Sequence, residues 1–174
     1  MLEAFDAAVN AALTPWRQGM LLVAVAWFTD IGAGHTAVAV AAVASALLWS
    51  GGRGRFVAPL WLVFLGAEAT TWSIKFAVGR LRPPSLPGIE ALSPSFPSAH
   101  ATVALALYGF MALTVAAGAP RHRWAILGCG VLLVFLIGFS RIVLSLHYLT
   151  DVLAGYAIAG AWLWFGWRRV ARPP

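Results

Sequence analysis

Residues 140–151 read SRIVLSLHYLTD and place Arg141, His147 and Asp151 between two long apolar runs. Ionisable side chains are costly at membrane depth, so such a group marks a functional site or a buried ion pair. The flanking runs are each long enough to cross a bilayer as a helix, which takes about 20 residues. The stretch therefore predicts a turn between two membrane helices, with charged groups gathered where the chain reverses.

The whole chain has the composition of a membrane protein. It has 174 residues, of which 61% are hydrophobic and 10% are charged, whereas soluble domains carry about 25% charged residues. Residues 1–174 are predicted to form a single membrane domain. The nine Trp residues are interpreted as anchors at the membrane interface and not as stacking platforms for bases, so nucleic acid is excluded as a partner.

Apolar stretches separated by Gly, Pro and Arg predict an all-α integral membrane protein with a bundle of six helices. The predicted spans are residues 16–31, 35–50, 56–79, 98–118, 124–143 and 147–167. Ahead of them, apolar residues recur at helical spacing from Leu2 to Leu13. Residues 2–14 are therefore predicted to form a short helix lying on the membrane surface.

Most of the twelve Lys and Arg residues fall on one side of this six-span arrangement. Because basic residues in short loops stay in the cytoplasm, that side is predicted to be cytoplasmic, with both termini on it. Lys75, Arg80, Arg82 and Arg141 fall on the opposite side, which normally avoids positive charge. We therefore expect a protein of the inner (plasma) membrane whose periplasmic or exterior face needs cations for its function.

The residue types on this outer face suit phosphoryl transfer to water. His147 and Asp151 are spaced i, i+4, so the carboxylate can orient the imidazole and leave its other nitrogen free to attack phosphorus. His100 can protonate the leaving oxygen and later deprotonate the attacking water. This pattern predicts a phosphohistidine intermediate.

Three cations on the same face would hold the phosphate. Arg82 and Arg141 offer planar forks matched to phosphate oxygens, and Lys75 adds a point charge. The helix start predicted at SFPSAH, residues 95–100, adds backbone N–H groups that favour an anion. No His, Cys or carboxylate spacing typical of a metal site occurs, so neither a metal nor another cofactor is expected.

Three segments resemble the signature of the type 2 phosphatidic acid phosphatase (PAP2) superfamily. They read KFAVGRLRP at residues 75–83, PSAH at 97–100 and SRIVLSLHYLTD at 140–151, all within residues 68–160 and in the family's order. The resemblance implies that His147 is the nucleophile, Asp151 its partner and His100 the acid and base. It also implies that phosphate is bound by Lys75, Arg82, Ser98, Ala99 and Arg141. Ala99 stands where the family usually has Gly, and it keeps the backbone donor.

The preferred interpretation is a membrane phosphatase acting on a lipid phosphomonoester or diphosphate. By the resemblance, candidate substrates are undecaprenyl diphosphate, phosphatidylglycerophosphate, phosphatidic acid and a lipid A phosphate, with membrane lipids as the surrounding partners. One alternative is a small transporter or proton-coupled channel, which would distribute ionisable residues through the membrane depth. Another is a lipid-phosphate binder without catalysis.

Four further ionisable residues have more than one interpretation. Arg80 either contacts lipid headgroups or takes part in the site. Glu68 is either an acid that positions Lys75 or a buried, protonated carboxyl with a local partner. Asp30 and His35 flank a predicted outer turn and are interpreted as capping residues, with contact to substrate as the alternative.

Overall fold

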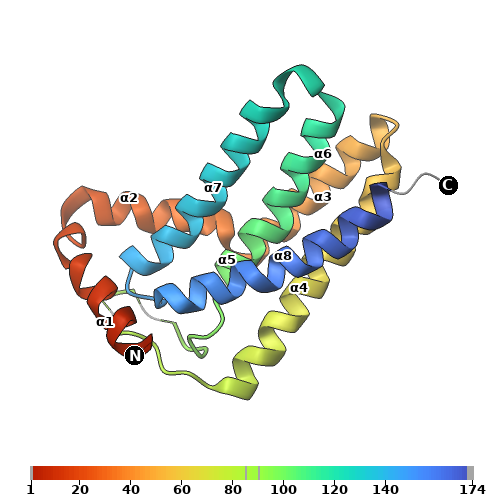
Figure 1. Ribbon diagram of the computed structural model, residues 1–174. Coiled ribbons are helices and arrows are strands. Elements are labelled where there is room, and N and C mark those ends of the chain that lie inside the picture. The colour runs from red at the N-terminus through yellow and green to blue at the C-terminus, as the bar shows by residue number, and fades with distance from the viewer. Residues whose placement is uncertain (1, 85, 90, 172–174) are drawn as a thin grey trace.

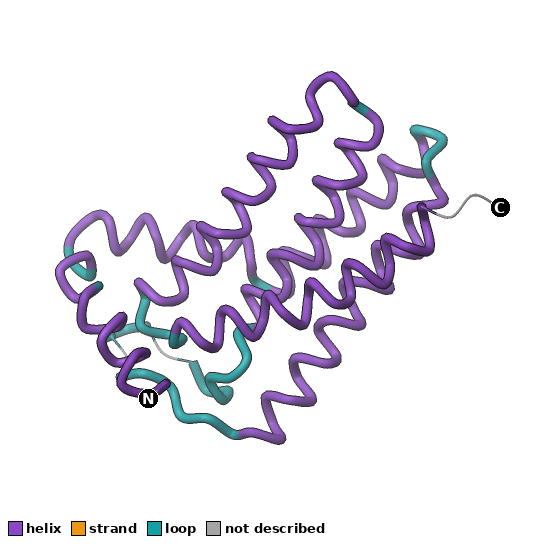
Figure 2. The backbone as a smooth tube through the Cα atoms, viewed as in Figure 1, coloured by secondary structure: helices purple, strands orange, loops and turns teal. Residues whose placement is uncertain are grey.

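The computed structural model describes residues 2–84, 86–89 and 91–171 (Figure 1). These residues form helices and the loops that connect them, and no β-strand occurs among them (Figure 2). The prediction of an all-α protein is therefore confirmed.

Eight α-helices follow one another along the described residues. They are α1 Leu2–Ala12, α2 Gly19–Thr29, α3 Gly34–Ser50, α4 Val57–Val78, α5 Ala99–Val103, α6 Phe110–Gly118, α7 Arg123–Val143 and α8 Leu149–Ala171. The π-helical segment η4, Ala104–Gly109, joins α5 to α6 in one continuous rod. Single 3-10 turns precede or follow α2, α3, α4 and α7.

Four helical segments are long and apolar enough to cross a membrane. They are Gly54–Val78, Ala99–Gly118, Pro120–Val143 and Leu149–Val170, and they agree with the four later spans predicted from sequence. The two earlier spans differ from the prediction, because α2 and α3 meet at a bend of 52° instead of reversing direction. The described residues thus provide four spans, or five if this bent pair counts as one, and the six-span count is not confirmed.

The reason lies at the junction of α2 and α3. With 11 residues, α2 is only about 16 Å long, too short to cross a hydrocarbon core of about 30 Å. At Gly32 an added Cβ would lie 2.6 Å from a methyl of Ile137, so glycine lets the bend pack against α7. Tyr108 of η4 fixes the junction by donating a hydrogen bond of 2.5 Å to the carbonyl of Ile31.

Because of the bend, helix α1 lies at the other end of the bundle from the one predicted. Helix α1 packs at the end of the bundle that holds the start of α8, and the far end of α8 lies at the opposite end (Figure 1). Asp6 of α1 pairs with Arg80, and Arg17 donates to the carbonyl of Val143 at 2.9 Å. Helix α1 and the end of α8 thus lie at opposite ends of the bundle (Figure 1), and the prediction that both termini lie on one side of the membrane is not confirmed.

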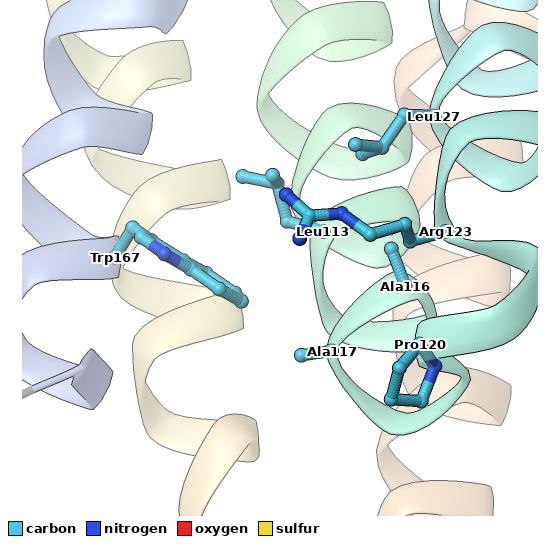
Figure 3. A pocket seen from close by; sticks show the side chains of 7 residues that line it. All are labelled: Leu113, Ala116, Ala117, Pro120, Arg123, Leu127 and Trp167. Carbon is cyan, nitrogen blue, oxygen red and sulfur yellow. The ribbon is translucent and has the colours of Figure 1, made fainter.

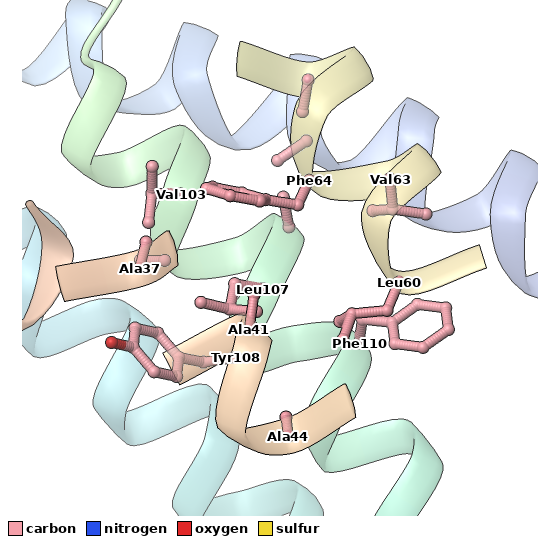
Figure 4. Packing of buried hydrophobic residues seen from close by; sticks show 14 of the residues in the cluster. Ala37, Ala41, Ala44, Leu60, Val63, Phe64, Val103, Leu107, Tyr108 and Phe110 are labelled. Carbon is pink, nitrogen blue, oxygen red and sulfur yellow. The ribbon is translucent and has the colours of Figure 1, made fainter. Parts of the chain in front are cut away.

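The apolar core occupies the half of the bundle away from α1. Helices α3, α4, α8 and the α5–α6 rod pack there around Leu60, Phe64, Leu107 and Phe110 (Figure 4). The facing residues of α3 are alanines, buried at positions 37, 41 and 44, which allows close helix contact. These apolar contacts hold together the helices whose opposite ends carry the polar residues of the pocket.

Candidate active site

The predicted site residues converge at the end of the bundle that carries α1. One pocket there has a lining drawn from α3, α4, α5, α7 and two loops. Its lining residues are Gly32, Gly34, Glu68, Trp72, Lys75, Arg82, Ala91, Ser93, Ala99, His100, Val103, Arg141 and His147. Ser98 and Asp151 lie buried directly behind this lining. The structure thus brings together all eight residues that the sequence had singled out.

The turn after α7 positions the imidazole of His147. The side chain of His147 is 3% exposed and that of Asp151 is 0% exposed, and Nδ1 lies 3.5 Å from Oδ2 of the carboxylate. That distance is at the edge of hydrogen-bond range. The same Oδ2 accepts hydrogen bonds from the backbone N–H of Tyr148 at 2.9 Å and from the hydroxyl of Ser95. His147 and Asp151 are therefore adjacent, and the Asp151 carboxylate is held in place by the donors of Tyr148 and Ser95.

The other ring nitrogen of His147 faces the pocket cations. Nε2 lies 3.3 Å from a guanidinium nitrogen of Arg82. A guanidinium can only donate, so Nε2 is the acceptor and the ring proton sits on Nδ1, toward Asp151. Burial, reinforced by the nearby charges of Arg141 and Arg82, lowers the pKa of His147 from 6.5 to about 4 despite the opposing effect of Asp151. Near neutral pH the imidazole is uncharged and offers a lone pair to the pocket.

The cations of the pocket are held by neutral acceptors. Lys75 donates to the carbonyls of Pro94 and Pro97, each at 2.7 Å. Arg82 donates to the carbonyls of Ser93 at 2.7 Å and Leu146 at 2.6 Å.

Arg141 is also held by a neutral acceptor, because it donates to the hydroxyl of Thr29 at 2.9 Å. Within the described ranges, Lys75, Arg82 and Arg141 have no carboxylate partner. Their positive charge is therefore available to an anion, which does not fit a network that merely locks helices together.

The loop of residues 79–98 supplies most of these acceptors. Gly79 ends α4 with a left-handed backbone, φ 62°, a conformation that glycine adopts without a Cβ penalty. The chain then runs along the pocket and reaches Ser98, which caps α5 and whose N–H donates to the carbonyl of Asp151 at 3.0 Å. Ala99 follows as the first residue of α5 and has no positive φ. The position therefore does not require glycine.

Of the residues with open interpretations, Arg80 lies behind the site and Glu68 lines it. Arg80 donates to Oδ1 of Asp151 at 2.6 Å, so it contacts the proposed catalytic carboxylate. Glu68 accepts a hydrogen bond from the indole N–H of Trp72 at 3.1 Å, which supplies the local partner that one interpretation required.

The capping interpretation of Asp30 and His35 is met only by the backbone of Asp30, which is the C-cap residue of α2. Both are exposed and neither lines the pocket. Helix α3 begins without a side-chain cap, and only the backbone carbonyl of Asp30 accepts a hydrogen bond, from the N–H of Ala33 at 3.0 Å.

Sequence reasoning missed several residues of the site. The hydroxyl of Ser95 donates to Asp151, and the hydroxyl of Thr29 accepts a hydrogen bond from Arg141. The carboxylate of Asp6, far away in the sequence, accepts one from Arg80. Ser95 lies between the first two signature segments and could have been found as a polar residue next to PSAH. Asp6 could have been found only by placing the N-terminal helix at this end of the bundle.

A second pocket lies at the opposite end, between α6, α7 and α8 (Figure 3). Its lining is apolar apart from Arg123, so it offers neither a nucleophile nor a base. No group of three or more His, Cys, Asp or Glu side chains suited to a metal ion occurs in the described part of the chain. The pocket around His147 is therefore the candidate active site.

Known proteins resemble this chain in sequence. A sequence profile of the PAP2 superfamily matches residues 56–173. Lipid A 1-phosphatase from Rhizobium etli is 34% identical over 114 residues, which cover 60% of this chain and 44% of that protein. Phosphatidylglycerophosphatase B from Bacillus subtilis is 27% identical over 161 residues, which cover 87% of this chain and 79% of that protein. The chain thus spans less than half the length of the lipid A 1-phosphatase.

Solved structures share the fold. The PAP2-type phosphatidylglycerolphosphate phosphatase from Bacillus subtilis superimposes with a TM-score of 0.90 at 23% identity, covering 98% of this chain and 87% of that one. LpxE from Aquifex aeolicus superimposes with a TM-score of 0.75 at 22% identity, covering 92% and 93%. The overall arrangement of the helices is therefore shared with solved structures.

Proposed function

The chain belongs to the PAP2 superfamily, and from this premise we propose that it is a membrane phosphatase that hydrolyses a lipid phosphomonoester or diphosphate. One observation carries the proposal. His147 lines a pocket together with the cations Lys75, Arg82 and Arg141, which have no carboxylate partner among the described residues, and its Nε2 lies 3.3 Å from Arg82. A nucleophile surrounded by unneutralised cations suits the transfer of a phosphate group, whose developing negative charge the cations would stabilise.

The reaction proceeds in two displacements. Nε2 of neutral His147 attacks phosphorus, an N–P bond forms, and the P–O bond to the leaving group breaks while His100 donates a proton to the leaving oxygen. His100, now neutral, then takes a proton from water, whose oxygen attacks phosphorus and breaks the N–P bond. Asp151 keeps the Nδ1 proton in place and stabilises the positive ring of the intermediate.

The lipid nature of the substrate rests on the position of the pocket and on the relatives. The pocket lies at one end of helices long enough to cross a membrane, where a lipid headgroup would be found. The relatives' names state action on lipid A and on phosphatidylglycerophosphate. The candidate substrates are these two lipid phosphates, phosphatidic acid and undecaprenyl diphosphate.

We place the pocket at the periplasmic or exterior face of the inner membrane, with α1 on that face. Exposed cations support this orientation, because Arg55, Arg121, Arg123, Arg168 and Arg169 all lie at the far end. The cations at the pocket end are buried or half-buried. Loops rich in exposed cations stay in the cytoplasm.

The activity is tested with purified protein in detergent and no added metal. Inorganic phosphate should be released from at least one of the four lipids, and His147→Ala should abolish the release. Brief reaction with a radiolabelled substrate should leave acid-labile, alkali-stable phosphate on the wild-type protein and none on the variant. Full phosphate release by His147→Ala would refute the mechanism. Lipid binding without turnover by the wild type would instead make the protein a binder.

The orientation is tested by labelling in whole cells. In a Cys129→Ser background, a cysteine replacing the fully exposed Leu92 should react with an impermeant maleimide from outside. A cysteine replacing Arg121 at the far end should react only after lysis. The reverse pattern would place the pocket in the cytoplasm.

A further inference from the structure

Helix α1 is oriented with its polar side toward the protein. The side chain of Asp6 is 0% exposed and Asn10 is buried, whereas Leu2 and Phe5 are exposed. A carboxylate withdrawn from water is stable only with charged or hydrogen-bonding partners. The partners of Asp6 therefore indicate what α1 does.

Arg80 connects Asp6 to the active site. One guanidinium nitrogen of Arg80 lies 2.8 Å from Oδ2 of Asp6, and another lies 2.6 Å from Oδ1 of Asp151. Its planar group also lies over the ring of Tyr148, 4.3 Å from the centroid. Burial acts to lower the pKa of Arg80, but the hydrogen bonds and charges of the two carboxylates raise it above its ordinary value. The guanidinium is thus a permanent cation shared between two carboxylates.

Asp6 also holds the backbone next to Asp151. Its Oδ1 accepts a hydrogen bond of 3.1 Å from the N–H of Thr150, and its Oδ2 accepts one from the hydroxyl of the same residue. Thr150 lies in the first turn of α8, where free N–H groups favour a carboxylate. Asp6 therefore fixes Asp151 by two routes, through its side-chain partner Arg80 and through its neighbour in the chain.

We propose that Asp6 and Arg80 form a clamp that positions Asp151 for catalysis, so that α1 is a working part of the site. The inference rests on the proposed function. With Oδ1 held by Arg80, the carboxylate cannot rotate about its axis, and Oδ2 stays directed at Nδ1 of His147. Neither Asp6 nor Arg80 lines the pocket, and both act through Asp151.

The clamp is tested with Asp6→Asn, which keeps the shape and removes the charge, and with Arg80→Lys, which keeps the charge and removes the fork. Each should lower kcat by about 10- to 100-fold, because small misplacement of a catalytic group has effects of this order. KM should change less than threefold, and phosphohistidine formation should slow by the same factor as kcat. Glu3→Gln, on the exposed side of α1, is the matched control and should retain wild-type kcat.

A double-mutant cycle separates positioning from a general structural role. Asp6→Asn combined with Asp151→Asn should be no slower than Asp151→Asn alone, because the clamp acts only through that carboxylate. Losses that multiply, or values of kcat within twofold of wild type in both clamp variants, would overturn the proposal. If Asp6→Asn folds poorly, the same cycle is measured with Arg80→Lys in its place, alone and combined with Asp151→Asn. Absence of activity in the wild type would refute the phosphatase and not the clamp.

A second, independent observation concerns Glu68. The pocket extends along α4 from Lys75 past Trp72 to Glu68, two turns and about 10.5 Å away along the helix axis. Oε2 of Glu68 accepts the hydrogen bond from Trp72. Oε1 is buried and has no hydrogen-bond partner in the ranges that the structure describes. A buried acceptor of this kind is costly unless a ligand supplies a donor.

We infer that Glu68 and Trp72 form a subsite for the group attached to the phosphate, one that bears a hydroxyl or amide N–H. Glycerol and sugar groups carry such donors, and the indole face suits their C–H surfaces. A phosphate bonded directly to the first, as in a diphosphate, would be repelled by the carboxylate, and the diacylglycerol of phosphatidic acid has no free donor. Given the proposed phosphatase activity, the subsite favours phosphatidylglycerophosphate and lipid A phosphate over phosphatidic acid and undecaprenyl diphosphate.

The test compares kcat/KM for phosphatidylglycerophosphate, whose terminal phosphate is carried by a glycerol with a free hydroxyl, and for phosphatidic acid, whose diacylglycerol has none. Glu68→Ala should lower the value for the first by at least tenfold relative to the second, because the hydroxyl of the first lipid then loses its buried acceptor. Trp72→Phe should shift the ratio in the same direction by less. An equal effect on both lipids would overturn the subsite while leaving the phosphatase assignment intact, because His147→Ala tests that separately.

Discussion

The two ends of the bundle are built from opposite kinds of buried residue. At the pocket end, Lys75, Arg141, His147 and Asp151 are at most 5% exposed and are held by hydrogen bonds to carbonyls, hydroxyls and Arg80. At the far end, aromatic and aliphatic side chains fill the space, as where Phe110 meets Trp167 edge to face at 5.9 Å. Charged groups withdrawn from water are retained for chemistry, whereas apolar packing stabilises the fold.

This division leads to an expectation about single substitutions. A change at the far end should lower stability and leave the activity of each folded molecule intact. A change at the pocket end should lower the activity of each folded molecule and leave its stability nearly unchanged.

Phe110→Ala should give the largest loss of stability at the far end. Phe110 is fully buried against Leu60, Leu107 and Trp167, and truncating a buried Phe costs about 3–5 kcal/mol of unfolding free energy. Unfolding in a detergent–denaturant titration measures this loss, and kcat per folded molecule should stay within twofold of wild type. Leu132→Ala on the exposed face of α7 is the control and should change little. A large fall in kcat with unchanged stability would contradict the separation.

Arg141→Lys should give the converse result at the pocket end. Lysine keeps the charge but loses the planar fork and the hydrogen bond to Thr29. Loss of one preorganised donor for the developing phosphate charge typically costs about 100- to 1,000-fold in rate. Steady-state phosphate release measures the loss, and the unfolding midpoint should move little. Arg123→Lys, at the far-end pocket, should leave both quantities unchanged.

Sequence alone predicted much of the fold. The four later spans follow from the lengths of the apolar runs, since a bilayer demands about 20 residues from any helix that crosses it. Hydropathy does not report direction, however, so the 52° bend between α2 and α3 was predicted as a reversal. That single error added a crossing and moved α1 to the wrong end of the bundle.

The same error explains which site residues were predicted and which were not. Lys75, Arg82, His100, Arg141 and His147 carry charge or ring nitrogens near the ends of predicted spans, so their convergence followed from the pattern. Asp6 pairs with Arg80 across 74 positions of the chain, and the predicted topology placed these two residues on opposite sides. Neutral supports such as Thr29 and Ser95 have no distinctive pattern, because a hydroxyl acquires its role only from the neighbours that folding brings.

The titration of His147 tests whether this imidazole is buried beside the pocket cations. The pKa of His147 is lowered to about 4, first by burial and then by the pocket cations. The imidazole should therefore remain neutral down to about pH 4, and a histidine NMR signal that is absent in His147→Ala should titrate there. The folded pKa lies below the unfolded value of 6.5, so the stability from this neutral ring is present above about pH 6.5. It is lost as the pH falls toward 4. A titration midpoint at or above 6.5 would contradict the buried, cation-flanked geometry.

Ala99→Gly should have the smallest effect, although it restores the residue usual in the family. Ala99 lies where the 79–98 loop gives way to the rigid α5–α6 rod, and its φ is not positive, so glycine offers no conformational relief. Glycine in a helix costs up to about 1 kcal/mol relative to alanine, and the backbone N–H toward the pocket is the same in both. We expect kcat within about twofold of wild type and a slightly lower unfolding midpoint. A tenfold gain in kcat would mean that the working site needs a left-handed backbone at residue 99, and the pocket end would then depend on loop motion as well as on its fixed charges.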